Sequence, residues 1–196
     1  MVFHLCQELR LQGKMSISST GIGRMLGVAA HTVRKDLNYL GEIGNTGSGY
    51  DIGRLEGHLA QALGFAQVRK ACIVGLGRLG SALLEYDRFG PCGFSIEAGF
   101  DANINRIETI KTDIKVYPAY EMADVVRRKA IELALVAVPA AAAQDVANAL
   151  INGGIRGIVN FTPVVIDVGI SDIVVRNMNV VNEMRVLASL MTLNQG

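Results

Sequence analysis

The sequence has few cysteines and no long apolar run, and each shortage excludes a class of protein. Cys6, Cys72 and Cys92 are far apart and odd in number, which fits neither a disulfide framework nor a cluster of zinc ligands. No segment reaches the roughly 18 uninterrupted apolar residues of a membrane span, and the amino-terminal segment lacks the apolar core of a secretory signal. We therefore expect a cytoplasmic protein that binds neither a membrane nor a metal ion.

Tryptophan is absent, aromatic residues make up only 6% of the chain, and the net charge is only +1. Because so small a charge creates no overall field for nucleic acid, any DNA contact must come from a local basic patch. Half of the residues are hydrophobic and 22 are glycine, a balance that favours an α/β architecture over a disordered or fibrous chain. A length of 196 residues favours a small module joined to a medium-sized one.

The first part of the chain has the periodicity of helices. From Val2 to about Leu40 the apolar residues recur at helical spacing, with breaks at 13–18 and 27–28, which predicts three helices. Residues 41–52 are dense in glycine and turn formers and predict a tight hairpin. A fourth helix is expected over 54–63, with Gly64 closing it.

From Lys70 onward, short apolar runs alternate with helical stretches, which is the pattern of a parallel βαβ sheet. A last helix, rich in valine, methionine and leucine, is expected over 181–193. We therefore expect a first domain of residues 1–66, a second of 67–178, and a carboxyl-terminal segment of 179–196.

A glycine loop follows the first strand of the second domain. The apolar run Ala71–Val74 leads into Gly75, Leu76, Gly77, Arg78, Leu79 and Gly80, and a helical segment follows. Gly75 permits a tight turn, Gly77 lets the backbone approach a pyrophosphate, and Gly80 lets the helix pack closely on the strand. These six residues are predicted to bind the cofactor NAD(H), although Arg78 is equally well explained as a surface charge.

Asp101 ends the second strand, about 20 residues after the last glycine, where such folds place an acid that binds the ribose hydroxyls. Its charge would repel a 2′-phosphate, so the sequence favours NAD over NADP. Open α/β sheets also collect ligand contacts after their later strands. We therefore expect the nicotinamide half to be lined by Val138, Pro139, Asn160, Phe161 and Thr162.

Groups suited to catalysis are scarce near this loop. His4, His31 and His58 all precede it, and no Ser-His-Asp, metal-binding or paired-carboxylate pattern is present in the sequence. We therefore expect the dinucleotide to be a signal and the protein not to be an enzyme.

A helix-turn-helix is predicted in the first domain. Apolar residues on either side of a turn at Gly27 have its spacing, and the third helix directs His31, Arg34, Lys35 and Asn38 away from the core. Arginine and asparagine read guanine and adenine in a major groove. The residues expected to contact double-stranded DNA are Ser19, His31, Thr32, Arg34, Lys35, Asn38, Gly49 and Tyr50.

The order and spacing of several segments together resemble the Rex family of redox-sensing transcriptional repressors over essentially the whole chain. These segments are VRKDLNYLG, GNTGSGYDI, IVGLGRLGSAL, GFD, VAVPAAAAQ and GIRGIVNFTPV. The resemblance implies an α/β protein with an amino-terminal winged helix, a Rossmann domain that binds NADH and NAD⁺ competitively, and a carboxyl-terminal helix swapped between the subunits of a homodimer. It also implies that NADH closes the dimer and releases operator DNA.

The chain departs from the family's pattern at four positions. His4, Asn179 and Val180 stand where the pattern has an arginine, an aspartate and an aromatic residue, and Ala29 replaces a serine that caps the third helix. Gly21 and Gly23 each lower the helix propensity of the second helix by about 1 kcal/mol.

Two other readings fit the same residues. One is an NAD(H)-binding enzyme or an acyl-CoA-binding module, since CoA-binding domains share the glycine turn. The other is a regulator that has kept the fold and lost redox sensing. Asp101 favours NAD(H) over CoA, because the CoA ribose carries a 3′-phosphate that a carboxylate would oppose.

Overall fold

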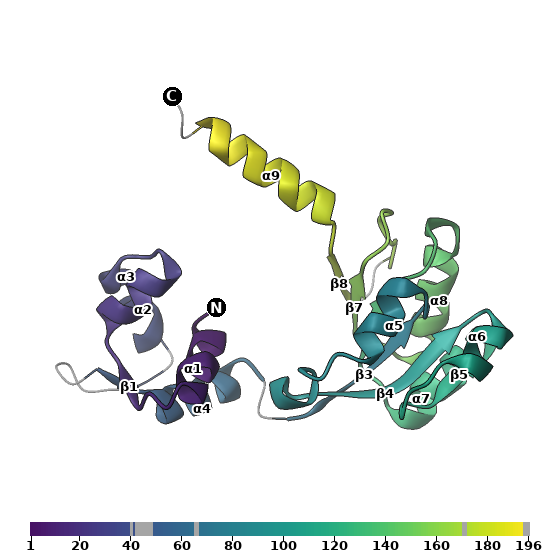
Figure 1. The fold of residues 1–196 in the computed structure, drawn as a ribbon, viewed down its shortest axis with the longest axis horizontal. Helices are drawn as coiled ribbons and strands as arrows, with labels where there is room; N and C mark the ends of the chain where they lie inside the picture. The colour runs from purple at the N-terminus through teal and green to yellow at the C-terminus, as the bar shows by residue number, and fades with distance from the viewer. Residues whose placement is uncertain (40, 42–48, 65–66, 170–171, 194–196) are drawn as a thin grey trace. The chain divides into compact units, whose positions relative to one another are not determined.

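The chain divides into two compact units, Met1–Gln67 and Val68–Gly196. The structure is a computed structural model that describes residues 1–39, 41, 49–64, 67–169 and 172–193 (Figure 1). The tight hairpin predicted over 41–52 lies largely outside the described residues, and its last residue, Ile52, is helical.

The first unit is a helical module with a short two-stranded sheet. Its elements are α1 (Val2–Leu11), β1 (Ser16–Ile17), α2 (Ser19–Leu26), α3 (Ala30–Asn38), β2 (Tyr50–Asp51) and α4 (Ile52–Ala62). The three predicted amino-terminal helices are confirmed. The fourth begins at Ile52, earlier than expected, because the Asp51 side chain caps it by accepting a hydrogen bond from the Arg54 N–H at 2.8 Å.

Buried apolar side chains from all four helices form the core of this unit. They include Leu9, Ile22, Val33, Leu37 and Leu55. The strands β1 and β2 pair antiparallel, with Ser16 opposite Asp51 and Ile17 opposite Tyr50.

A close turn joins α2 to α3. Gly27 adopts a φ of +69° and ends α2 in the left-handed region, which confirms the predicted turn. A Cβ on Gly23 would lie only 2.5 Å from the carbonyl oxygen of Val28. The glycine that weakens α2 as an isolated helix is therefore needed for α2 to approach the turn.

The second unit is a six-stranded sheet whose neighbouring strands all pair in parallel, in the order β5-β4-β3-β6-β7-β8. The strands are β3 (Arg69–Val74), β4 (Phe94–Asp101), β5 (Val116–Pro118), β6 (Leu133–Val136), β7 (Gly157–Asn160) and β8 (Val174–Asn177). The helices are α5 (Arg78–Leu84), α6 (Ile104–Thr109), α7 (Met122–Lys129), α8 (Ala143–Gly153) and α9 (Val180–Leu193). This strand order is that of the Rossmann fold, and the direction of winding reverses between β3 and β6.

Alternate residues of the central strand face two apolar layers. Cys72 and Val74 pack with residues of α7 and α8, whereas Ala71 and Ile73 pack with Leu84 of α5. Because a strand buried on both faces needs apolar residues at every position, the uninterrupted run from Ala71 to Val74 is explained.

The last helix, α9, has no buried residue in the single chain. None of its large apolar side chains is less than 48% exposed: Val180, Val181, Met184, Val186, Leu187, Leu190, Met191 and Leu193. An apolar surface of this kind marks an interaction site in soluble proteins. Among the described residues, no helix is both long and apolar enough to cross a membrane.

Candidate dinucleotide and DNA sites

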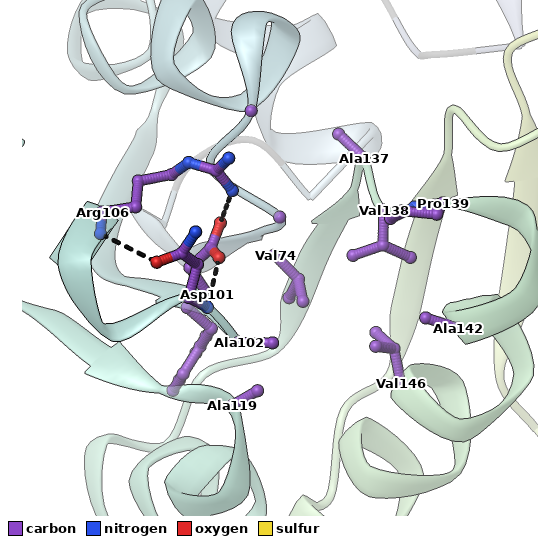
Figure 2. A pocket seen from close by; sticks show the side chains of 14 residues that line it. Val74, Asp101, Ala102, Arg106, Ala119, Ala137, Val138, Pro139, Ala142 and Val146 are labelled. Atoms are coloured by element: carbon purple, nitrogen blue, oxygen red, sulfur yellow. Dashed lines mark hydrogen bonds and ion pairs between the residues drawn. The ribbon is translucent and has the colours of Figure 1, made fainter.

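A cavity of about 640 Å³ opens at the carboxyl ends of β3, β4 and β6 (Figure 2). Gly75 and Gly77 of the glycine loop line it, together with Asp101 and Arg106 after β4, and Val138 and Pro139 after β6. It therefore lies where the strand order reverses, the place at which open α/β sheets bind their ligands.

The three glycines of the loop meet different surroundings. A Cβ on Gly75, whose φ is +87°, would lie 2.6 Å from the Ala137 carbonyl oxygen, and a Cβ on Gly80 would collide with the Gly75 carbonyl oxygen. A Cβ on Gly77 would meet no other atom within 4 Å. Packing thus requires glycine at 75 and 80. The glycine at position 77 leaves bare backbone beside the cavity, which fits the close approach of a pyrophosphate.

This difference predicts opposite effects for two alanine substitutions. Gly77→Ala should leave the melting temperature unchanged but weaken NADH binding by about tenfold or more, because its methyl group occupies space that the diphosphate needs. Gly80→Ala should instead destabilise the fold by about 1–3 kcal/mol or more, because α5 can no longer pack on the loop. Thermal melts and calorimetric titration with NADH measure both effects. Equal loss of stability in the two variants would contradict the assigned roles.

Asp101 is buried at the end of β4 and only 5% exposed. Its Oδ2 accepts hydrogen bonds from the Leu76 N–H at 2.7 Å and from Arg106 Nη1 at 2.8 Å, and its Oδ1 accepts one from the Asn103 N–H at 2.8 Å. Burial opposes ionisation, but the Asn103, Arg106 and Leu76 donors outweigh it and hold the pKa of Asp101 below its usual value. The carboxylate is therefore ionised at neutral pH. Its stabilising effect is present above the unfolded pKa and is lost as the pH falls through the folded pKa.

The other residues expected at the cofactor site are placed less uniformly. Leu76 is buried, whereas Arg78 and Leu79 are exposed and lie outside the cavity lining. Val138 and Pro139 line the cavity, and their contact with nicotinamide remains a prediction.

Asn160, Phe161 and Thr162 lie outside that lining. The fully buried amide of Asn160 instead organises the end of β7. It donates to Val164 O at 2.7 Å and to Asn177 Oδ1 at 2.9 Å, and it accepts from Thr162 Oγ1 at 2.7 Å. The contact of Asn160, Phe161 and Thr162 with nicotinamide remains a prediction.

Sequence reasoning missed Arg106. It lies on α6, whose amino terminus is capped by the Asn103 side chain, and this turn brings Arg106 back to Asp101. The Asn103 cap is a recognisable start signal for a helix. It could have shown that the chain turns back here.

The ionisable side chains in the cavity lining are Asp101 and Arg106, and they are paired with each other.

The two buried cysteines have raised pKa values. Burial, with a smaller effect of the Glu56 carboxylate, raises the pKa of Cys6 to about 11, and burial raises the pKa of Cys72 to about 12. Neither thiol is therefore a nucleophilic thiolate at neutral pH. Within the described part of the chain, no group of three or more histidine, cysteine, aspartate or glutamate residues could hold a metal ion.

The outward face of α3 carries the residues expected to contact DNA. His31, Arg34, Lys35 and Asn38 are exposed, and Thr32 is half-buried. Arg34 Nη1 donates to Ser19 Oγ at 3.0 Å, so a side chain of α2 orients the guanidinium. Lys35 and Asn38, with Tyr39, border a shallow hollow of about 250 Å³.

The remaining residues of the predicted DNA site, Gly49 and Tyr50, contact other parts of the first unit. A Cβ on Gly49, whose φ is +82°, would lie 2.9 Å from Ile17 O, and Tyr50 packs against the helical core. Their contact with DNA remains a prediction. Ala29 is the N-cap residue of α3 and makes no side-chain cap, as the sequence indicated.

A helix-turn-helix unit followed by a Rossmann unit defines a class of transcription factors that respond to a nucleotide. Similar proteins and family models support this class for the chain. A family model described as "CoA binding domain" matches residues 66–164, and one described as "Putative DNA-binding protein N-terminus" matches residues 4–38. The redox-sensing transcriptional repressor Rex of Carboxydothermus hydrogenoformans is 38% identical over 92% of this chain and 86% of its own length. Rex 1 of Enterococcus faecalis is 34% identical over 95% of this chain and 86% of its own.

The chain therefore belongs to the Rex family of redox-sensing transcriptional repressors, which confirms the resemblance drawn from the sequence. Two solved structures extend the similarity to the fold. The crystal structure of RSP with β-NAD⁺ and operator DNA has a TM-score of 0.86 and 28% identity, covering 98% of this chain and 88% of RSP. RSP with β-NADH has a TM-score of 0.83 and 26% identity, covering 99% and 90%. These matches confirm the predicted fold class.

Proposed function

We propose that this protein is a homodimeric repressor that binds operator DNA through its first unit and releases the DNA when NADH binds its second unit. The dinucleotide is a signal and not a reactant, and the protein acts in the cytoplasm. The observation that carries the proposal is the cavity beside the glycine loop, where Gly77 exposes bare backbone and Asp101 holds an ionised carboxylate. RSP, whose fold this chain shares, has been solved with NAD⁺ and operator DNA and with NADH.

The chain's own residues supply binding and orientation. Gly77 is the N-cap residue of α5 and has no side chain to cap it, which leaves the N–H groups of the first turn available to a diphosphate. Asp101 accepts from ribose hydroxyls, and Val138 and Pro139 cover the cavity after β6. NADH and NAD⁺ differ in the charge and shape of the nicotinamide ring, and this difference is the signal that the protein detects.

Asp101→Ala should weaken NADH binding by about 1.5–3 kcal/mol, the value of a charge-assisted hydrogen bond, and should relax discrimination against NADPH. The removed carboxylate both accepts from the ribose and repels a phosphate. Calorimetric titrations with NADH and NADPH measure the two affinities. They must be made below the melting temperature of the variant, because the Leu76 and Asn103 N–H groups lose their acceptor. An unchanged ratio of the two affinities would remove Asp101 from the site.

A second candidate function is CoA binding, which the family model matching residues 66–164 favours. Calorimetric titration of the wild-type protein with NADH, NAD⁺, NADPH and CoA separates the two functions. NADH binding with no heat from CoA supports the repressor. Tight CoA binding without NADH binding would refute redox sensing and support CoA binding as the function.

A further inference from the structure

The acidic residue at the ribose end of the cavity is paired with a cation. Arg106 reaches from α6, and its guanidinium lies beside the Asp101 carboxylate (Figure 2). Both residues line the cavity, but Asp101 is 5% exposed and Arg106 is 42% exposed. A ligand that enters therefore meets a neutral pair whose arginine is the accessible partner.

The hydrogen-bonding capacity of Asp101 is nearly used up. An ionised carboxylate has about four acceptor positions, and Leu76, Asn103 and Arg106 occupy three of them. A ribose with free 2′- and 3′-hydroxyls brings two donors, so one of the present donors must leave. The Leu76 and Asn103 donors belong to the backbone, whereas the Arg106 side chain is half-exposed and can leave Asp101 without any movement of the backbone. The ribose diol therefore competes with Arg106 for Asp101.

A 2′-phosphate places a different demand on the same two residues. It brings no donor at the 2′ position and needs cations and N–H donors. Arg106 has five N–H donors in a planar fork, one of which is used at Asp101, and guanidinium groups bind phosphate in two-point contacts. Since the pair is neutral, the repulsion expected from an isolated carboxylate is also reduced.

We propose that Arg106 sets the discrimination between a ribose 2′-hydroxyl and a ribose 2′-phosphate, by competing with the hydroxyls for Asp101 and by donating to the phosphate. NADPH is therefore a ligand of this site, and the preference for NADH is smaller than Asp101 alone predicts. The proposal rests on dinucleotide binding by this cavity.

Arg106→Gln tests the proposal, with the affinities for NADH and NADPH measured by calorimetry. The variant should bind NADPH about tenfold more weakly, while its NADH affinity stays within about threefold of wild type or improves. Arg106→Lys should lie between the two, because it keeps the charge and loses the planar fork. Arg78→Gln is the matched control. It removes an exposed cation of the glycine loop and should change both affinities by the same factor, because both ligands carry the diphosphate.

Equal weakening of both ligands by Arg106→Gln would overturn the proposal, since Arg106 would then only position Asp101. Unchanged NADPH affinity would overturn it as well. A wild-type protein that binds neither dinucleotide would refute the proposed function itself. If the wild-type protein binds NADH and the Arg106→Gln variant has the same ratio of NADH to NADPH affinity as wild type, only the role of Arg106 is refuted.

Discussion

Replacing both Arg34 and Lys35 with alanine is expected to abolish operator binding and to leave NADH binding intact. Both side chains lie on the exposed face of α3, and Ser19 orients Arg34 there. A two-point arginine contact to a base contributes about 1–3 kcal/mol, and a lysine at a phosphate adds salt-dependent affinity. The double variant should therefore lose about 100-fold or more in affinity. Anisotropy of a labelled operator duplex measures the loss.

Arg54→Ala is the control for this variant, because Arg54 is an exposed arginine of the same unit that lies on α4. It should bind the operator as wild type does. Calorimetry with NADH should give the wild-type affinity for both variants, since the cavity belongs to the other unit. Operator binding that survives in the double variant would show that α3 is not the recognition helix.

Deleting residues 181–196 is expected to convert the dimer into monomer or aggregate and to eliminate operator binding. The large apolar side chains of α9 are all about half-exposed or more in the single chain, and burying the exposed part of each would contribute about 1–2 kcal/mol. We propose that a second copy of the chain covers them, because most oligomers are built from identical subunits. Two half-sites on DNA must then be engaged at a fixed separation, which a monomer cannot do.

A point variant makes the same test without removing the helix. Leu187→Glu places a charge among Met184, Leu190 and Met191 on one side of α9, whereas Ser189→Glu places it on the opposite side. Light scattering should show a monomer for Leu187→Glu and a dimer for Ser189→Glu. If α9 instead folds back on its own unit, Leu187→Glu lowers stability and the protein stays dimeric.

Much of the fold follows from local patterns in the sequence. The parallel βαβ sheet of the second unit was predicted, because short apolar runs such as Ala71–Val74 alternate with helical stretches. The roles of Gly75, Gly77 and Gly80 also follow from the order of strand, loop and helix. At Gly75 and Gly80 the local pattern and the tertiary contacts require the same residue.

What sequence reasoning missed depends on contacts between elements. Gly23 counts as a weakness of its helix until the carbonyl of Val28 is seen beside it. Arg106 is an unremarkable helix residue until α6 turns it back to Asp101. The hydrogen bonds of Asn160 to Val164 and Asn177 also join residues that a linear pattern does not bring together.

The most direct test of the account is the affinity of the full-length protein for a duplex from its own upstream region, measured by fluorescence anisotropy at fixed salt. The account predicts tight binding without ligand, release of the duplex by NADH, and recovery of binding when excess NAD⁺ competes with the NADH. Calorimetry on the same sample confirms that NADH is bound. Operator binding that persists unchanged when NADH saturates the protein would contradict it.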